Sequence, residues 1–156
     1  LSKDKGTNTL LEAASRMPDT RFVFAGYGES VDYIKTVKNA EFVGFKTGDE
    51  LKELISKASC TVCPSEMYEN CPYSVMESQV LATPVICADI GGIPELIENG
   101  KTGLLFESGN AHDLEAKLRY LLETPELVRE YSENCKNLKL ESPESYYEKL
   151  IKIYEA

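Results

Sequence analysis

The chain has 156 residues, 42% of them hydrophobic and 28% charged, a composition that predicts one globular domain. Its 17 Lys and Arg against 26 Asp and Glu give a net charge of −9, which argues against nucleic acid or anionic membranes as partners. The odd number of cysteines, five, indicates reduced thiols in a cytoplasmic protein. His112 is the only histidine, so a His-based metal site is not expected.

Short β-rich runs alternate with segments of helical periodicity. Strands are predicted at residues 21–25, 41–44, 60–63, 84–87 and 104–106. Helices are predicted at residues 10–17, 30–37, 72–81 and, after a capping-box sequence at residues 47–50, up to residue 58. Three further helices are expected to begin after Asn110, Thr124 and Ser142. This alternation predicts an α/β fold: one Rossmann-like domain over residues 1–156, an open parallel sheet with helices on both faces and C-terminal helices.

The chain begins with a polar loop, residues 1–6, that leads directly into a helix. In an architecture of alternating strands and helices, such a loop normally follows a strand. We therefore expect that the first strand of the sheet is truncated and that the sequence is half of a larger protein.

The densest group of polar side chains follows the predicted strand at residues 60–63. Pro72 can begin the next helix, which would leave the backbone amides of Tyr73, Ser74 and Val75 unpaired, as an anion site. Glu69 precedes this helix and Glu77 lies within it, and carboxylates there can accept hydrogen bonds from ribose or sugar hydroxyls. The alternative is that these acidic residues are solvated charges that favour a helix start.

An ordered series of short motifs runs through most of the chain. The motifs are Lys5-Gly6, Phe24-Ala-Gly26, Phe42-Val-Gly44, Pro64-Ser65, the pair Glu69 and Glu77, Thr83-Pro84-Val85, Gly91-Gly92-x-x-Glu95 and Gly100-x-x-Gly103. Together they resemble the C-terminal, donor-binding domain of family 4 retaining glycosyltransferases, which have the GT-B fold. The resemblance covers about residues 1–123. The amino-acid sequence of residues 69–75 is similar to that of members that build bacterial surface polysaccharides.

The resemblance implies a role for each matching residue. Lys5 would contact the donor diphosphate and stabilise the departing phosphate, Glu69 would lie near the reacting carbon of the transferred sugar, and Glu77 would bind the ribose hydroxyls. Backbone amides hold sugar and phosphate in a segment that matches Asn70, Cys71, Pro72, Tyr73, Ser74 and Val75. Gly26 and Gly28 would border the phosphates, and the nucleotide base would lie at Val43, Gly44 and Phe45.

The sequence departs from the family pattern in three ways. The arginine that partners the family lysine would precede Leu1, and the usual Glu-Gly-Phe-Gly loop is replaced here by Glu69-Asn-Cys-Pro. The N-terminal domain, which supplies the acceptor site, is absent. We therefore expect this chain to bind a donor weakly and to be inactive alone.

The expected partners are a UDP- or GDP-linked sugar, the missing N-terminal domain and a glycan or lipid-linked acceptor, with the enzyme in the cytoplasm and held at the membrane through that domain. No cofactor or metal is expected, because Lys5 and the helix amides would stabilise the leaving diphosphate. Two alternatives remain open: another GT-B enzyme, such as a sugar-nucleotide epimerase, or a non-catalytic nucleotide-binding or interaction domain. Cys60 and Cys63 are interpreted as packing residues, and Gly91-Gly92 as a tight turn.

Overall fold

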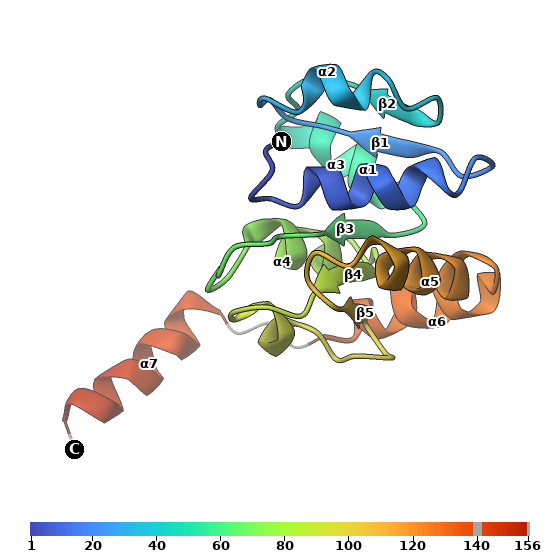
Figure 1. Ribbon diagram of the computed structural model, residues 1–156. Helices are drawn as coiled ribbons and strands as arrows, with labels where there is room; N and C mark the ends of the chain where they lie inside the picture. Colours follow the sequence, from blue (N-terminus) through green and yellow to red (C-terminus); the bar gives the residue numbers. More distant parts are fainter. Residues whose placement is uncertain (139–141, 156) are drawn as a thin grey trace.

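The computed structural model describes residues 1–138 and 142–155 and has the predicted α/β architecture (Figure 1). The strands are β1 (Phe22–Phe24), β2 (Ala40–Phe42), β3 (Thr61–Cys63), β4 (Val85–Ala88) and β5 (Gly103–Phe106). The helices are α1 (Thr7–Ser15), α2 (Val31–Ile34), α3 (Gly48–Ser56), α4 (Tyr73–Val80), α5 (Ala111–Leu122), α6 (Pro125–Lys136) and α7 (Pro143–Tyr154), with a short 3₁₀ helix, η1 (Ile93–Leu96). Each predicted strand and helix is confirmed, with small shifts at its ends.

All described strand pairs are parallel, and they form two sheets, β1-β2 and β3-β4-β5. The amide of Phe22 and the carbonyl of Phe24 bond toward β2, and the amide of Thr61 bonds toward β4. Backbone groups alternate in direction along a strand. The N–H and C=O groups of Val23 therefore point to the edge of β1 that faces away from β2, and those of Val62 point to the edge of β3 that faces away from β4. Among the described residues, no backbone hydrogen bond joins β1 to β3.

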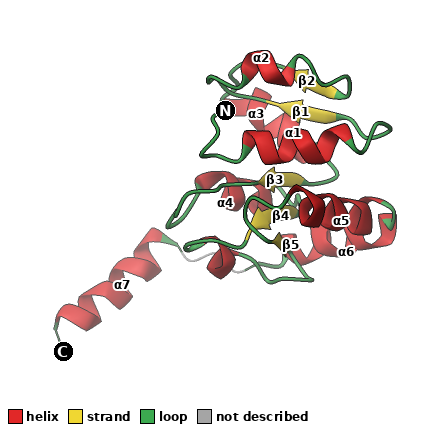
Figure 2. Ribbon diagram, in the orientation of Figure 1, coloured by secondary structure: helices red, strands yellow, loops and turns green. Residues whose placement is uncertain are grey.

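A cleft of about 1090 Å³ lies between these two edges, lined by residues 21–25 on one side and 59–63 on the other. Figure 2 shows α1 drawn across the space between β1 and β3. Side-chain packing connects the two sheets, because one apolar core contains Phe22 and Phe24 of the first sheet and Ile86 and Phe106 of the second. Leu11 of α1 and Leu114 and Leu118 of α5 belong to the same core. The sheets are therefore connected by buried side chains rather than by a continuous ladder of backbone bonds.

Helix ends follow the sequence signals with two exceptions, one of which is Thr124, which occupies the cap position of α6 without a side-chain bond. The Asn110 side chain accepts hydrogen bonds from the amides of His112 and Asp113, and that of Ser142 accepts one from Ser145, as expected for N-caps. The capping box at residues 47–50 is wrong, because Thr47 occupies the cap position without a side-chain bond. The Glu50 carboxylate instead lies 3.6 Å from the Lys46 ammonium, a neighbouring cation that competes for it.

Helix α7 extends away from the rest of the protein (Figure 1). Two of its tyrosines are largely exposed, with 62% of Tyr147 and 79% of Tyr154 accessible to solvent. The site therefore has to be sought in the body of the domain, where the ends of the parallel strands meet the loops.

Candidate functional site

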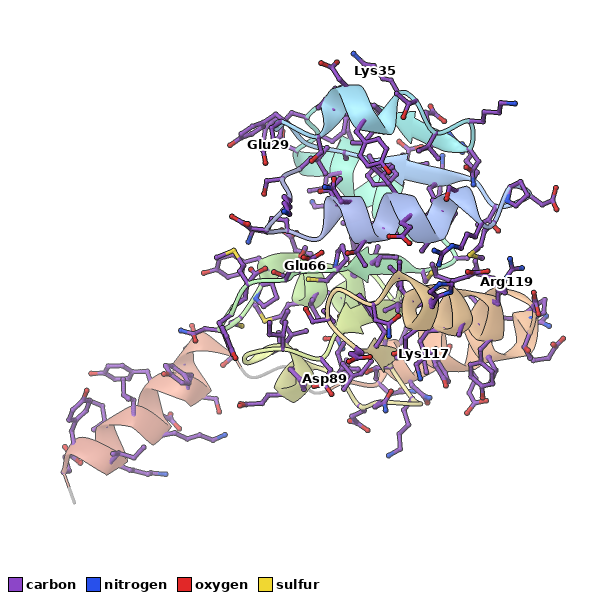
Figure 3. All side chains as sticks on the ribbon, in the orientation of Figure 1. Glu29, Lys35, Glu66, Asp89, Lys117 and Arg119 are labelled. Carbon is purple, nitrogen blue, oxygen red and sulfur yellow. The ribbon has the colours of Figure 1, made fainter. Side chains whose placement is uncertain are left out.

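The loop that follows β3 is held against the loop that precedes α1. The Glu66 amide donates a hydrogen bond to the Asp4 carbonyl at 2.9 Å, and the Thr9 hydroxyl donates one to the Glu66 carboxylate at 2.5 Å. Glu66, labelled in Figure 3, thus ties the loop to both the N-terminal segment and α1. Because Lys5 directly follows Asp4, the hydrogen bond between Glu66 and Asp4 holds Lys5 beside the segment that carries Glu69.

Lys5 and Glu69 form an ion pair between these two loops. The Lys5 Nζ lies 3.0 Å from Glu69 Oε2, and 51% of the lysine side chain but only 16% of the glutamate side chain is exposed. A pocket of about 270 Å³ lies beside the pair, and its further lining includes Phe24, Val62, Cys63, Ser65, Pro72 and Ser74. A half-exposed cation at the mouth of such a pocket can turn from the carboxylate to an incoming anion.

Helix α4 begins at this pocket, but one of its first backbone amides already donates a hydrogen bond within the helix. Pro72 and Ser74 line the pocket, whereas the Val75 side chain is buried and its amide donates to the Pro72 carbonyl at 3.1 Å. The prediction of an unpaired amide at Val75 is therefore wrong: the first turn closes on itself. Tyr73 is exposed, and neither Asn70 nor Cys71 is among the residues that line the pocket.

Glu77 lies on α4 and lines the large cleft rather than the small pocket. The two cavities are continuous in their walls, because Phe24, Cys63 and Ser74 line both of them. The two predicted carboxylates therefore line adjoining cavities, Glu69 the small pocket and Glu77 the large cleft.

The segments after β1 and β2 lie side by side at the rim of this site. The Gly26 amide donates to the Gly44 carbonyl at 2.8 Å, and the rings of Tyr27 and Phe45 contact each other with centroids 5.4 Å apart. Gly28 packs against the Leu1 backbone, and Leu1 in turn lines the small pocket. Tyr27 was not singled out from the sequence, although it stands between the two glycines that were.

The contact between Gly92 and the Glu69 loop was not predicted from the sequence either. Its amide donates to the Glu69 carbonyl at 2.8 Å, and a Cβ at residue 92 would lie 2.3 Å from the Asn70 carbonyl oxygen. The Gly91-Gly92 turn therefore packs directly against the backbone of the Glu69 loop. The two consecutive glycines were the sequence signal that could have indicated this close approach.

Two negative findings apply to residues 1–138 and 142–155. No group of three or more His, Cys, Asp or Glu side chains there is placed to hold a metal ion. None of the helices in the same ranges has the length and apolar character needed to cross a bilayer.

The family described as glycosyl transferases group 1 matches residues 1–138. The chain belongs to this family. It is 35% identical to the sulfoquinovosyl transferase SQD2 of Arabidopsis thaliana over 134 residues, which is 80% of this chain and 26% of that protein. It is 31% identical to the alpha-maltose-1-phosphate synthase of Mycolicibacterium smegmatis over 151 residues, 84% of this chain and 39% of that protein. The chain thus spans less than half the length of these two relatives.

Solved structures share its fold. The S. aureus protein TarM superposes with a TM-score of 0.86 at 24% identity, over 99% of this chain and 33% of that one. HepE of Anabaena, solved with UDP-glucose, gives a TM-score of 0.78 at 24% identity, over 88% of this chain and 41% of that one. Family and fold together identify this chain as a group 1 glycosyltransferase domain with the GT-B fold.

Proposed function

We propose that the chain is the donor-binding half of a retaining, family 4 glycosyltransferase that uses a UDP- or GDP-linked sugar. The observation that carries this proposal is the Lys5–Glu69 pair, 3.0 Å apart at a pocket beside the start of α4. A cation and a carboxylate at one pocket suit a ligand that is anionic at one end and rich in hydroxyls at the other. HepE, with the same fold, has been solved with such ligands, UDP and UDP-glucose.

The chemistry follows from where charge develops. Cleavage of a sugar–phosphate bond places positive charge on the anomeric carbon and negative charge on the leaving diphosphate. In our proposal Lys5 leaves Glu69 and contacts the diphosphate, and the amides at the start of α4 other than that of Val75 add further donors. Glu69, released from the lysine, accepts hydrogen bonds from the sugar hydroxyls, while Glu77 in the adjoining cleft does so from the ribose.

The complete reaction needs more than these residues. We propose that the longer protein supplies the acceptor site from another domain and transfers the sugar to a glycan or lipid-linked acceptor in polysaccharide biosynthesis. The relatives are more than twice as long as the matched region, which supports this division. In this proposal the isolated chain binds nucleotide but does not turn over.

Calorimetry with UDP, GDP and their glucose conjugates tests the proposal. Lys5→Met is expected to weaken binding of the free nucleoside diphosphate about tenfold or more, because a charge-assisted contact is lost. Lys3→Met, in the same exposed loop, is the matched control and should bind as the unchanged chain does. Absence of heat with all four ligands at millimolar concentration, or equal losses in the two variants, would overturn the assignment.

The two carboxylates are separated by a second comparison. Glu77→Ala should weaken binding of UDP and UDP-glucose alike, because both carry the ribose. Glu69→Ala should weaken UDP-glucose more than UDP, because only the former carries the sugar. The reverse pattern would contradict the roles proposed for these residues.

A further inference from the structure

Glu66 links the two loops of the site through its side chain as well as through its backbone. Its carboxylate accepts a hydrogen bond from the Thr9 hydroxyl at 2.5 Å, and its amide donates to the Asp4 carbonyl at 2.9 Å. A threonine hydroxyl within a helix commonly bonds to the backbone carbonyl one turn earlier, which for Thr9 is that of Lys5. The Thr9 hydroxyl bonds instead to the loop after β3, so a side chain holds the first turn of α1 to that loop.

Both ends of this link lie in fixed surroundings. Thr9 belongs to α1 and is buried, with 7% of its surface exposed. Beside Glu66, Ser65 is buried as well, and its carbonyl accepts a hydrogen bond from the Ser108 hydroxyl at 3.1 Å. The loop after β3 is therefore held between α1 and the loop after β5, and the Glu66 carboxylate makes the side-chain hydrogen bond to α1.

The negative charge of Glu66 by itself does not favour an anion at this site. A carboxylate in the loop beside Lys5 repels a diphosphate that the lysine holds. If Glu66 were only a solvated charge, its removal would strengthen nucleotide binding. If its bond to Thr9 sets the position of Lys5, removal of the carboxylate weakens binding in spite of the lost repulsion. The two roles therefore predict changes of opposite sign in nucleotide affinity.

We propose that Glu66 is a positioning residue for Lys5. By accepting the Thr9 hydrogen bond, it holds the lysine loop against the Glu69 loop, in the arrangement that places Lys5 Nζ 3.0 Å from Glu69 Oε2. The lysine side chain is 51% exposed, so its position depends on the backbone that carries it more than on neighbouring side chains. The inference rests on the proposed function, because its effect is measured as nucleotide binding.

Calorimetry with UDP on four single variants of the chain tests the inference. Glu66→Ala should weaken binding about fivefold, because the hydrogen bond to the charged group is lost. Glu66→Gln removes the charge but keeps an acceptor oxygen for Thr9, so it should bind UDP at least as tightly as the unchanged chain. Thr9→Val removes the donor, leaves the charge and should resemble Glu66→Ala. Glu12→Ala is the matched control, because it removes the same charge from the exposed side of α1, and it should change nothing.

A second comparison shows whether the effect passes through the lysine. In a Lys5→Met chain, Glu66→Ala should not weaken UDP binding further, because the group that it positions is gone. Circular dichroism and a thermal melt establish that each variant is folded before affinities are compared. Equal or tighter binding by both Glu66 variants, or the same loss from Glu66→Ala with and without Lys5, overturns the inference.

The same measurements separate this inference from the proposed function. UDP binding that depends on Lys5 but not on the Glu66 carboxylate would overturn the positioning role and leave the proposed function standing. An unchanged chain that binds no UDP, or binds it equally well as the Lys5→Met variant, would contradict the proposed function and the positioning role with it.

Discussion

Gly6 packs so closely against Pro64 that a Cβ at residue 6 would lie 1.7 Å from the Pro64 carbonyl oxygen. Its backbone also has a φ of 67°, a conformation that side chains disfavour. This contact joins the loop of Lys5 to the loop of Glu69, so the ion pair depends on a glycine beside it.

Gly6→Ala is expected to lower both stability and nucleotide affinity. Gly48 is the matched control, because its φ is 56° and nothing lies within 4 Å of a Cβ there. The left-handed conformation costs each alanine variant about 1–2 kcal/mol, and the collision with Pro64 adds to the cost only at residue 6. Urea unfolding should show a clearly larger loss for Gly6→Ala, and UDP binding should weaken only in that variant. Equal losses would show that the two loops separate without cost.

The stability of the chain should fall in alkaline solution through two thiols, those of Cys60 and Cys135. Burial raises the pKa of Cys60 to about 12 and that of Cys135 to about 11, from an ordinary value of 9.0. Between pH 9 and 11 the unfolded chain therefore releases protons that the folded chain keeps, so the free energy of unfolding decreases as pH rises. Below pH 9 this contribution is fully present.

The slope of the free energy of unfolding against pH shows whether these two thiols are responsible. Each contributes about 1.4 kcal/mol per pH unit inside the window. A chain with both Cys60→Ala and Cys135→Ala should start less stable because of the lost packing, but its free energy of unfolding should fall less steeply between pH 9 and 10.5 in urea titrations. A slope identical to that of the unchanged chain would rule these two groups out as the cause.

The unpaired edges of β1 and β3 should accept an added strand, which would stabilise the chain. The Leu1 amino group lies 2.7 Å from the Tyr27 carbonyl oxygen, just beyond the end of β1, so an extension joined to Leu1 can run into the cleft parallel to both strands. An extension of valine and isoleucine, as long as residues 21–25 that line the cleft, should raise the melting temperature by several degrees.

Amide hydrogen exchange locates the effect. The amides of Val23 and Val62 should become protected only with the apolar extension, and a Gly/Ser extension of equal length is the control. Similar melting temperatures with the two extensions would mean that the cleft does not accept a strand. The expectation that a strand precedes Leu1 remains a prediction.

Local patterns explain why the elements could be predicted. The apolar run at residues 84–87 became β4 (Val85–Ala88), and Asn110 caps α5 because its side chain needs only the next turn of backbone. Contacts between distant segments have no such signature. Neither the collision partner of Gly6 nor the hydrogen bond from Gly92 to Glu69 can be derived from neighbouring residues, since both depend on how loops meet after folding.

The sequence predicted which residues form the candidate site, and the structure brings only some of them to one pocket. Sheet logic placed the loop after β3 at a ligand edge, and the family resemblance added Lys5 to it. The structure brings Lys5 and Glu69 together but puts Glu77 in the adjoining cleft and uses the Val75 amide within the helix. The Val75 amide differs from the prediction because the short turn at Pro72 pairs its own backbone groups.

The two walls of the small pocket belong to different sheets. Phe24 stands on one wall, on β1, and Val62 and Cys63 stand on the other, on β3, with no backbone bond between the strands among the described residues. A molecule that contacts both walls therefore bridges the two sheets. Its binding free energy adds to the free energy of unfolding of the whole domain.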